Sequence, residues 1–303
     1  MDVSKLKDRL TAACPGMELL EQEPMSRHTS FRIGGPVGLM ARVRNEAEFA
    51  VALRVAAGLD IVPFVLGNGT NVLAGDGPLD RFVILTTGGL DTLERRGDTD
   101  IVCGAGVSLA KLATFAMEQG LTGLEFAHGI PGSLGGGMTM NAGAYGGELR
   151  DVAVASNYLT LNGEAGTLTG EAQQLSYRHS AYSDGDKFVT SAVLRLAPGD
   201  REQIRTRMEE LARKRRNSQP LEYPSAGSTF KRPVGGYAAA LIDQCGLKGL
   251  RVGGAQVSEK HAGFVINTGG ATCRDVLELT DQIRETVLRQ TGIILELEVR
   301  RLN

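Results

Sequence analysis

The stretch VLGNGTN, Val65–Asn71, distinguishes between the folds that this sequence could adopt. Two glycines, Gly67 and Gly69, follow an apolar run and alternate with small polar side chains. Glycine lets a backbone turn without a Cβ clash, so that successive N–H groups can face an anion such as pyrophosphate. A tight turn after a strand explains these residues equally well, because Gly-Asn-Gly is ordinary turn chemistry.

The loop is neither a Rossmann fingerprint nor a P-loop. A GxGxxG motif would need glycine where the chain has Val72, and a P-loop would need a lysine that this loop lacks. A dinucleotide bound at this loop therefore has to be held by another fold.

A second glycine-rich stretch, GIPGSLGGGMTMNAGAYGGE, runs from Gly129 to Glu148. It holds eight of the 40 glycines in the chain. A flexible surface loop is one interpretation, but a solvated linker would not interleave its glycines with apolar residues. The stretch therefore predicts a segment that wraps a flat cofactor. The apolar residues in question are Ile130, Leu134, Met138, Met140 and Tyr145.

Composition excludes several classes of protein. The 303 residues carry a net charge of −2 and a sequence pI near 6.1, which gives no electrostatic footprint for nucleic acid. No apolar run approaches the length of a membrane span. The histidines and cysteines show no metal-ligand spacing, so we expect no metal site, and four scattered cysteines indicate reduced thiols of a cytoplasmic protein.

Hydrophobic periodicity predicts helices alternating with strands in the first part of the chain, which is an α/β pattern. Short strands follow from Val152 to Leu196, and a domain boundary is expected near Pro198-Gly199. The final strand should alternate from Leu295. The expected helices are 46–56, 109–119, 201–216, 237–244 and 275–290, and the expected strands are 61–66, 81–86 and 293–302.

Seven motifs occur in an order that is far more specific than any one of them. Together they resemble the UDP-N-acetylenolpyruvoylglucosamine reductase family over nearly the whole chain. The motifs are TSFRIGG (Thr29–Gly35), LGNGTN (Leu66–Asn71), GIPGSLGGGMTMNAGAYG (Gly129–Gly146), YRHS (Tyr177–Ser180), AGSTFKRP (Ala226–Pro233), LKG (Leu247–Gly249) and LELEVR (Leu295–Arg300).

The resemblance implies an α+β protein with a vanillyl-alcohol-oxidase-type (PCMH-type) FAD-binding fold and a C-terminal α/β substrate-binding domain. The expected FAD-binding region is 1–199, in two subdomains divided near residue 90, and the substrate domain is 200–303. The chain resembles the shorter subclass, which lacks a tyrosine-bearing insertion. We expect a cytoplasmic monomer or weak dimer, with no nucleic-acid or membrane partner.

The resemblance also implies the reaction, which is reduction of UDP-N-acetylglucosamine enolpyruvate to UDP-N-acetylmuramate for peptidoglycan synthesis. NADPH donates the hydride and noncovalently bound FAD carries it. The implied FAD contacts come from the motifs quoted above. They are Arg32, Gly67, Asn68, Gly69, Thr70, Asn71, Gly129, Ile130, Pro131, Gly132, Gly135, Asn141, Gly143 and Ala144.

Three residues match the family's catalytic positions. Ser228, on a glycine-hinged loop, would donate the proton, although a serine there is otherwise most simply a turn residue. Arg178 would hold the carboxylate and its enolate form, although a surface arginine is the commoner case. Glu298, rather than Glu296, would be the catalytic carboxylate, although a solvated strand face explains both.

Four further residues match substrate-binding positions in the family, and each has a structural explanation as well. His261 in particular is expected to be structural. The basic run Arg213–Arg216 could meet nucleotide phosphates, but such a run is more often a solvated helix end that favours the helix dipole. The four residues are Tyr177, Arg232, Lys248 and His261.

Two alternatives stay open on the sequence alone. One is another flavin oxidase or dehydrogenase of the same fold that acts on a small alcohol or sugar; such an oxidase would not need Ser228 as a proton donor. The other is a nucleotide-binding or RNA-interacting protein that uses the basic helix, against which the near-neutral charge argues.

Overall fold

The computed structural model describes all 303 residues, and the chain forms two compact units. Unit 1 holds Met1–Glu21, Gly38–Asn68 and Asp80–Lys214, and unit 2 holds Gln22–Val37, Gly69–Leu79 and Arg215–Asn303. The sequence suggested one crossing between residues 199 and 200. The chain instead crosses at 214/215, and two N-terminal segments also belong to unit 2: one contains all of TSFRIGG, and the other begins within GNGTN, at Gly69.

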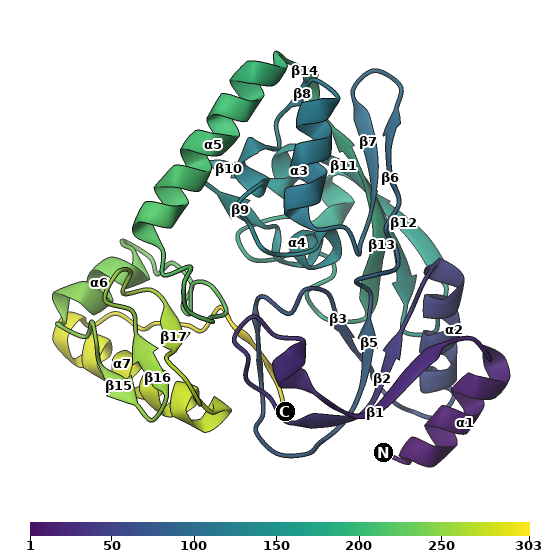
Figure 1. Cartoon of the computed structure of the whole chain (residues 1–303), viewed down its shortest axis with the longest axis horizontal. Helices are drawn as coiled ribbons and strands as arrows, with labels where there is room; N and C mark the ends of the chain where they lie inside the picture. Colours follow the sequence, from purple (N-terminus) through teal and green to yellow (C-terminus); the bar gives the residue numbers. More distant parts are fainter. The chain divides into compact units, whose positions relative to one another are not determined.

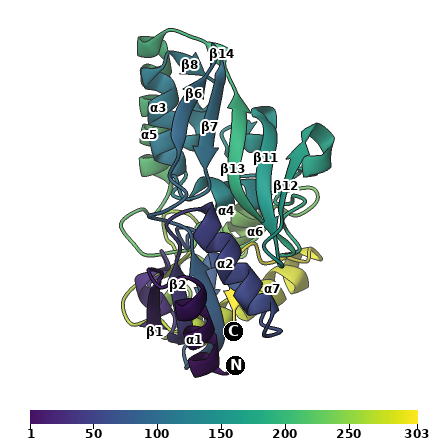
Figure 2. The same ribbon diagram turned by 90° about the vertical axis from the view of Figure 1, so that its right-hand side faces the viewer.

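Unit 1 is built on two sheets. The first has the strand order β1-β2-β5-β3, with β3 parallel to β5; its strands are β1 (Glu18–Pro24), β2 (Pro36–Arg42), β3 (Phe64–Leu66) and β5 (Leu79–Leu85). The second is antiparallel, with the order β12-β11-β13-β7-β6, and Figure 2 shows these strands side by side. They are β6 (Leu93–Arg96), β7 (Asp100–Gly104), β11 (Ala153–Thr160), β12 (Ala165–Thr169) and β13 (Lys187–Arg195).

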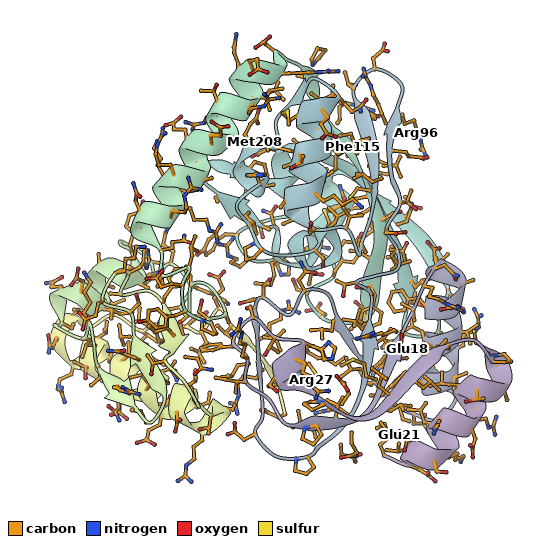
Figure 3. The ribbon with its side chains drawn as sticks, viewed as in Figure 1. Glu18, Glu21, Arg27, Arg96, Phe115 and Met208 are labelled. Atoms are coloured by element: carbon orange, nitrogen blue, oxygen red, sulfur yellow. The ribbon has the colours of Figure 1, made fainter.

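The helices of unit 1 share one apolar core with these sheets. Figure 3 labels Phe115 on α3 and Met208 on α5, and both side chains pack into that core. The helices are α1 (Val3–Ala13), α2 (Glu46–Ala57), α3 (Leu109–Glu118), α4 (Leu134–Met140) and α5 (Arg201–Ser218), and two short strand pairs, β8 (Leu121–Thr122) with β14 (Ala197–Pro198) and β9 (Gly143–Ala144) with β10 (Gly147–Glu148), complete the unit. None of the helices in the chain combines the length and apolar character that a membrane crossing requires.

Unit 2 has its own core, in which the long helix α7 packs against a small antiparallel sheet; these elements are coloured green to yellow in Figure 1. A separate parallel pair joins β4 to the last strand, β18. The elements are β4 (Val72–Ala74), α6 (Ala238–Gln244), β15 (Arg251–Val252), β16 (Ala255–Val257), β17 (Val265–Asn267), α7 (Cys273–Thr291) and β18 (Arg300–Leu302).

Helix caps explain where the helices begin. Asn45 and Asp200 cap α2 and α5, whose starts agree with the predicted ranges, and accept N–H bonds from Glu48 and Gln203. The predicted start of α7 at Asp275 is wrong by two residues. Thr272 is the N-cap, and Asp275 is its capping-box partner, because each side chain accepts the other's backbone N–H.

The final strand is much shorter than predicted. The alternation from Leu295 predicted a strand over 293–302, but only Arg300–Leu302 pairs regularly, and it pairs with β4. Before that, Leu297 forms an isolated bridge with Phe230. Within six residues, the last stretch therefore pairs first with Phe230 and then with β4. Period-2 alternation in the sequence cannot reveal such a change of pairing partner.

Candidate active site

The two glycine-rich stretches meet inside unit 1. The Asn68 side-chain amide donates to the carbonyl oxygen of Pro131 at 3.0 Å. Gly67 lies directly against Ser133, and a Cβ at Gly67 would collide with the Ser133 hydroxyl. Gly67 and Asn68 therefore lie against the Gly129–Gly146 segment within unit 1, and the cofactor contacts expected for both stretches remain a prediction.

Two buried polar atoms in this site have no partner. Ser133 is 1 % exposed, yet its Oγ makes no hydrogen bond, and Nδ1 of His128 is buried and equally unpaired. Leaving such a group unsatisfied costs about 1–3 kcal/mol, so unpaired buried groups call for a physical explanation. A ligand with polar atoms, such as FAD, supplies one, and these residues therefore fit that cofactor.

Ser133 was missed by the sequence interpretation, which attended to the glycines around it. The available signal was weak, because Ser133 is one of several side-chain donors in the segment, beside Thr139, Asn141 and Tyr145. Its burial against Gly67 depends on tertiary packing and cannot be predicted from the sequence of the segment.

Several glycines of the segment approach protein atoms as well. Gly135 packs on Ala105, whose Cβ would lie 3.0 Å from a Cβ at position 135, and Gly143 packs as closely on Glu148. The carbonyl of Gly132 accepts the Leu109 N–H at 2.9 Å. Part of the glycine excess that suggested a ligand is thus required for the chain to pack against itself.

Arg178 sits at the tip of a strained two-residue turn. Ser176 and His179 exchange both of their backbone hydrogen bonds, each 3.1 Å long, so Tyr177 and Arg178 form the tip. The φ angle of Arg178 is +56°, in the left-handed region. A turn with that angle at its third position favours glycine or asparagine, and another residue there costs about 1 kcal/mol or more. The Arg178 guanidinium lies 5.0 Å from the centre of the Tyr177 ring.

The turn is tied to the end of α4 by two side chains. The Asn141 amide donates to the carbonyl of Ser176 at 3.1 Å, and Ser180 Oγ donates to the carbonyl of Thr139 at 2.9 Å. Asn141 and Ser180 are 0 % and 1 % exposed. The segment predicted to wrap FAD therefore also supports the turn that carries Arg178.

In unit 2, TSFRIGG meets LGNGTN and the residue that precedes AGSTFKRP. The Ser30 N–H donates to the carbonyl of Gly69 at 3.1 Å, and the Ser30 hydroxyl donates to the carbonyl of Ser225 at 2.6 Å. Gly69 has a φ of +60°, and a Cβ there would collide with the carbonyl of His28. Arg32, predicted to contact FAD, is exposed and also left-handed, with φ +56°.

Ser228 and Glu298 occupy neighbouring positions on two paired stretches of unit 2. The Glu298 N–H donates to the carbonyl of Thr229 at 2.9 Å. Ser228 is exposed, and the preceding Gly227 is left-handed with nothing within 4 Å of a Cβ position. The structure therefore brings the expected proton donor and the expected carboxylate close together in unit 2, while Arg178 lies in unit 1.

The expected substrate residues differ in their surroundings. Lys248 pairs with Asp243 at 2.8 Å, and the Arg232 guanidinium lies 4.4 Å from the centre of the exposed Tyr237 ring. Both cations therefore sit at the surface of unit 2, where an anionic substrate could compete for them.

His261 has the features of a structural residue. Its Nδ1 accepts the Gly263 N–H at 3.2 Å, and its ring meets the Phe264 ring edge-on at 4.9 Å. Burial lowers the pKa of His261, which favours the neutral ring that this hydrogen bond requires. The expectation that His261 is structural is consistent with these contacts.

Comparison with known proteins gives two matching families. Residues 37–169 match the FAD binding domain family, and residues 219–302 match the family described as UDP-N-acetylenolpyruvoylglucosamine reductase, C-terminal domain.

Individual proteins match over almost the whole chain. The UDP-N-acetylenolpyruvoylglucosamine reductase of Agathobacter rectalis is 46% identical over 302 residues, covering 96% of each protein. That of Pediococcus pentosaceus is 43% identical over 95% of each. The crystal structure of UDP-N-acetylenolpyruvylglucosamine reductase from Thermus caldophilus matches with a TM-score of 0.81 at 35% identity, covering 95% of this chain and 100% of the other.

Proposed function

Because the chain belongs to the UDP-N-acetylenolpyruvoylglucosamine reductase family, we propose that Arg178, Ser228 and Glu298 are its catalytic residues. The fold is the FAD-binding fold of the vanillyl-alcohol-oxidase type, and the enzyme reduces UDP-N-acetylglucosamine enolpyruvate to UDP-N-acetylmuramate in peptidoglycan precursor synthesis. FAD is the cofactor and NADPH the reductant. Membership of this family leaves no support for an oxidase of another small alcohol or for an RNA-interacting protein.

FAD, when bound, supplies the hydride chemistry, and the protein has to hold it in place. We assign this role to GNGTN and the Gly129–Gly146 segment, with the unpaired Ser133 hydroxyl as a donor to the cofactor. Asn68 joins the two stretches through Pro131. The contact between these stretches is what supports the assignment, since neither stretch alone distinguishes a cofactor site from a turn.

Ser228 supplies the proton. Hydride arrives at the methylene carbon of the enolpyruvyl group, which leaves negative charge on the carbon next to the carboxylate and on the carboxylate itself. Ser228 Oγ donates its proton to that carbon. Ser228 is exposed and follows the left-handed Gly227, around which the space is open, so a substrate can reach the hydroxyl.

Arg178 and Glu298 act on the same developing charge. A guanidinium can bind a carboxylate through two parallel N–H bonds and holds its enolate form more strongly than its ground state. The observation that carries this assignment is the turn at 176–179. A left-handed arginine is a backbone strain of the kind that clusters at functional sites, and two buried side chains hold it there.

Glu298 and Glu296 provide a matched experiment. Both lie on the same stretch two residues apart, but Glu296 pairs with Lys231 at the surface. Glu298→Gln should slow product formation by about 10²–10⁴-fold, as expected for a residue that acts on a proton or charge in the transition state. Glu296→Gln should leave the rate within about twofold of the parent enzyme. Equal effects of the two changes would reject Glu298 as the catalytic carboxylate.

We further propose that the enzyme works in the cytoplasm as a monomer or weak dimer of the shorter subclass. The four free cysteines support a reducing compartment. Sedimentation velocity over a hundredfold range of protein concentration tests the association state, and a single dimeric species throughout would reject it.

A further inference from the structure

The end of helix α4 offers a role for Asn141 that the sequence did not suggest. We propose that Asn141 is a positioning residue for Arg178: its side-chain amide fixes the turn from Ser176 to His179, and through it the guanidinium. The inference rests on the catalytic role proposed above for Arg178.

Every polar atom of the Asn141 side chain is engaged by protein. Its Nδ2 donates to the Ser176 carbonyl at 3.1 Å and to Glu148 Oε2 at 2.9 Å, and its Oδ1 accepts the Arg150 N–H at 2.9 Å. The residue is 0 % exposed. Ser133 has an unpaired polar atom, whereas the Asn141 amide has both N–H groups donating and its oxygen accepting. The side chain of Asn141 therefore already has a structural role within the protein, without any contact with FAD.

The backbone of Asn141 is shaped for this task. Its φ of +42° places it in the left-handed region, where it forms the C-cap of α4. Asparagine is one of the few residues with a side chain that adopts this region readily. A left-handed asparagine therefore supports the turn of a left-handed arginine through its hydrogen bond to the Ser176 carbonyl.

The carbonyl that Asn141 holds is part of the turn itself. Ser176 contributes both its N–H and its carbonyl to the pair with His179, and the same carbonyl accepts the Asn141 amide. Ser180 adds the second tie, to Thr139. Because a left-handed arginine is strained, the turn needs outside support, and the Asn141 contact provides it together with the Ser180 tie.

Asn141→Asp is the sharpest substitution. Aspartate keeps the shape, the acceptor for Arg150 and the tolerance of left-handed φ, but it cannot donate to Ser176. It also places a carboxylate against Glu148, so Asn141→Asp combined with Glu148→Gln serves as the second variant. Glu148→Gln alone is the control, because glutamine can still accept the Asn141 amide.

Proteolysis reports on the turn without any chemistry. Trypsin cuts after arginine, and the Arg178–His179 bond lies at the tip of the turn. In the FAD-bound enzyme, Asn141→Asp with or without Glu148→Gln should speed cleavage at this bond by at least about tenfold. Cleavage after Arg96, in the distant β6–β7 hairpin, should not change. Unchanged cleavage at Arg178, or faster cleavage at both sites, would overturn the proposal.

The kinetic readout separates the two half-reactions. Reduction of the bound flavin by NADPH should keep its rate, while reoxidation by the enolpyruvyl substrate should slow about 10–10²-fold, because a displacement near 1 Å at a reacting group has effects of that size. Loss of FAD, or equal slowing of both half-reactions, would show that Asn141 serves the cofactor instead.

A double-mutant cycle with Arg178→Ala keeps this test separate from the proposed function. If Asn141 acts through Arg178, Asn141→Asp should add no further slowing once Arg178 is gone. If the two effects multiply, Asn141 does not act through Arg178. If Arg178→Ala leaves reoxidation unchanged, the catalytic role of Arg178 fails, and the tryptic result still decides whether Asn141 holds the turn.

Discussion

Asn71 donates its side-chain amide to the carbonyl oxygen of Glu298 at 3.1 Å, so the last residue of GNGTN supports the backbone of the expected catalytic carboxylate. The Asn71 carbonyl also accepts the Arg300 N–H at 2.9 Å, on the other side of Val299. Asn71 was expected to contact FAD. In unit 2 it holds the backbone of the chain's last stretch at Glu298 and at Arg300, so Asn71 supports the stretch that carries Glu298 through two hydrogen bonds.

The first prediction concerns the proton donor. Ser228→Ala should leave FAD binding and flavin reduction by NADPH near their native levels, because the cofactor motifs lie elsewhere. Reoxidation by the enolpyruvyl substrate should slow by about 10²–10⁴-fold from loss of a positioned acid. Ser228→Cys, a stronger acid of similar reach, should recover much more activity than alanine. Stopped-flow flavin absorbance measures each half separately, and equal slowing of both halves would make Ser228 a loop residue.

The second prediction concerns the unpaired hydroxyl of Ser133. Ser133→Ala should stabilise the FAD-free protein by about 1 kcal/mol, because a buried unsatisfied group is removed. The same change should weaken FAD binding about tenfold if Ser133 donates to the cofactor. Urea unfolding of the FAD-free protein and fluorescence titration with FAD give the two quantities. Unchanged FAD affinity would remove Ser133 from the cofactor site.

The third prediction uses two left-handed glycines with different surroundings. Gly69→Ala should destabilise the protein by about 3 kcal/mol or more, because its Cβ meets the His28 carbonyl in addition to the cost of φ +60°. Gly170 has φ +50° and nothing within 4 Å of a Cβ, so Gly170→Ala should cost only about 1 kcal/mol. Chemical denaturation of both variants checks the difference, and equal losses would contradict the collision.

The fourth prediction is that FAD is held without a covalent bond. Acid precipitation should release all of the yellow colour into the supernatant. Colour that stays with the pellet would indicate a covalent link, for which the nearest candidates in sequence to the glycine segments are His128 and Cys103.

The fifth prediction concerns Asp275 at the start of α7. Hydrogen bonds from the backbone N–H groups of Thr272 and Gly254 hold the pKa of Asp275 below its usual value. A lowered pKa contributes stability that is complete above the unfolded-state value of about 4 and is lost as the pH falls through the folded-state value. The stability lost in Asp275→Asn should therefore be about 0.5–1 kcal/mol at pH 7.

This deficit should shrink when the pH is taken from 7 to 3, because protonation removes the same charge from the parent protein. Urea unfolding at the two pH values measures it. Glu285→Gln, which changes an exposed carboxylate on the same helix, is the control and should show little difference at either pH. A deficit that grows toward pH 3 would contradict the assignment.

The sequence predicted those features of the fold that depend on residues close together in the chain. Asn45 and Asp200 begin helices because a side-chain oxygen satisfies an N–H three residues along the chain, and such pairs can be read from spacing. The order of the seven motifs likewise identified the family, because many weak local signals in a fixed order are jointly specific.

Contacts between segments far apart in the sequence determined the features of the site that the sequence did not predict. The sequence by itself determined the family, the FAD-binding fold, the reaction and most helices. Only the tertiary structure showed that Asn141 supports the Arg178 turn, that Asn71 supports Glu298, and that Ser133 is buried against Gly67 without a partner. The reason is physical: a side-chain amide can bind a ligand or a carbonyl from elsewhere in the chain equally well, and which one it meets depends on packing between residues far apart in sequence.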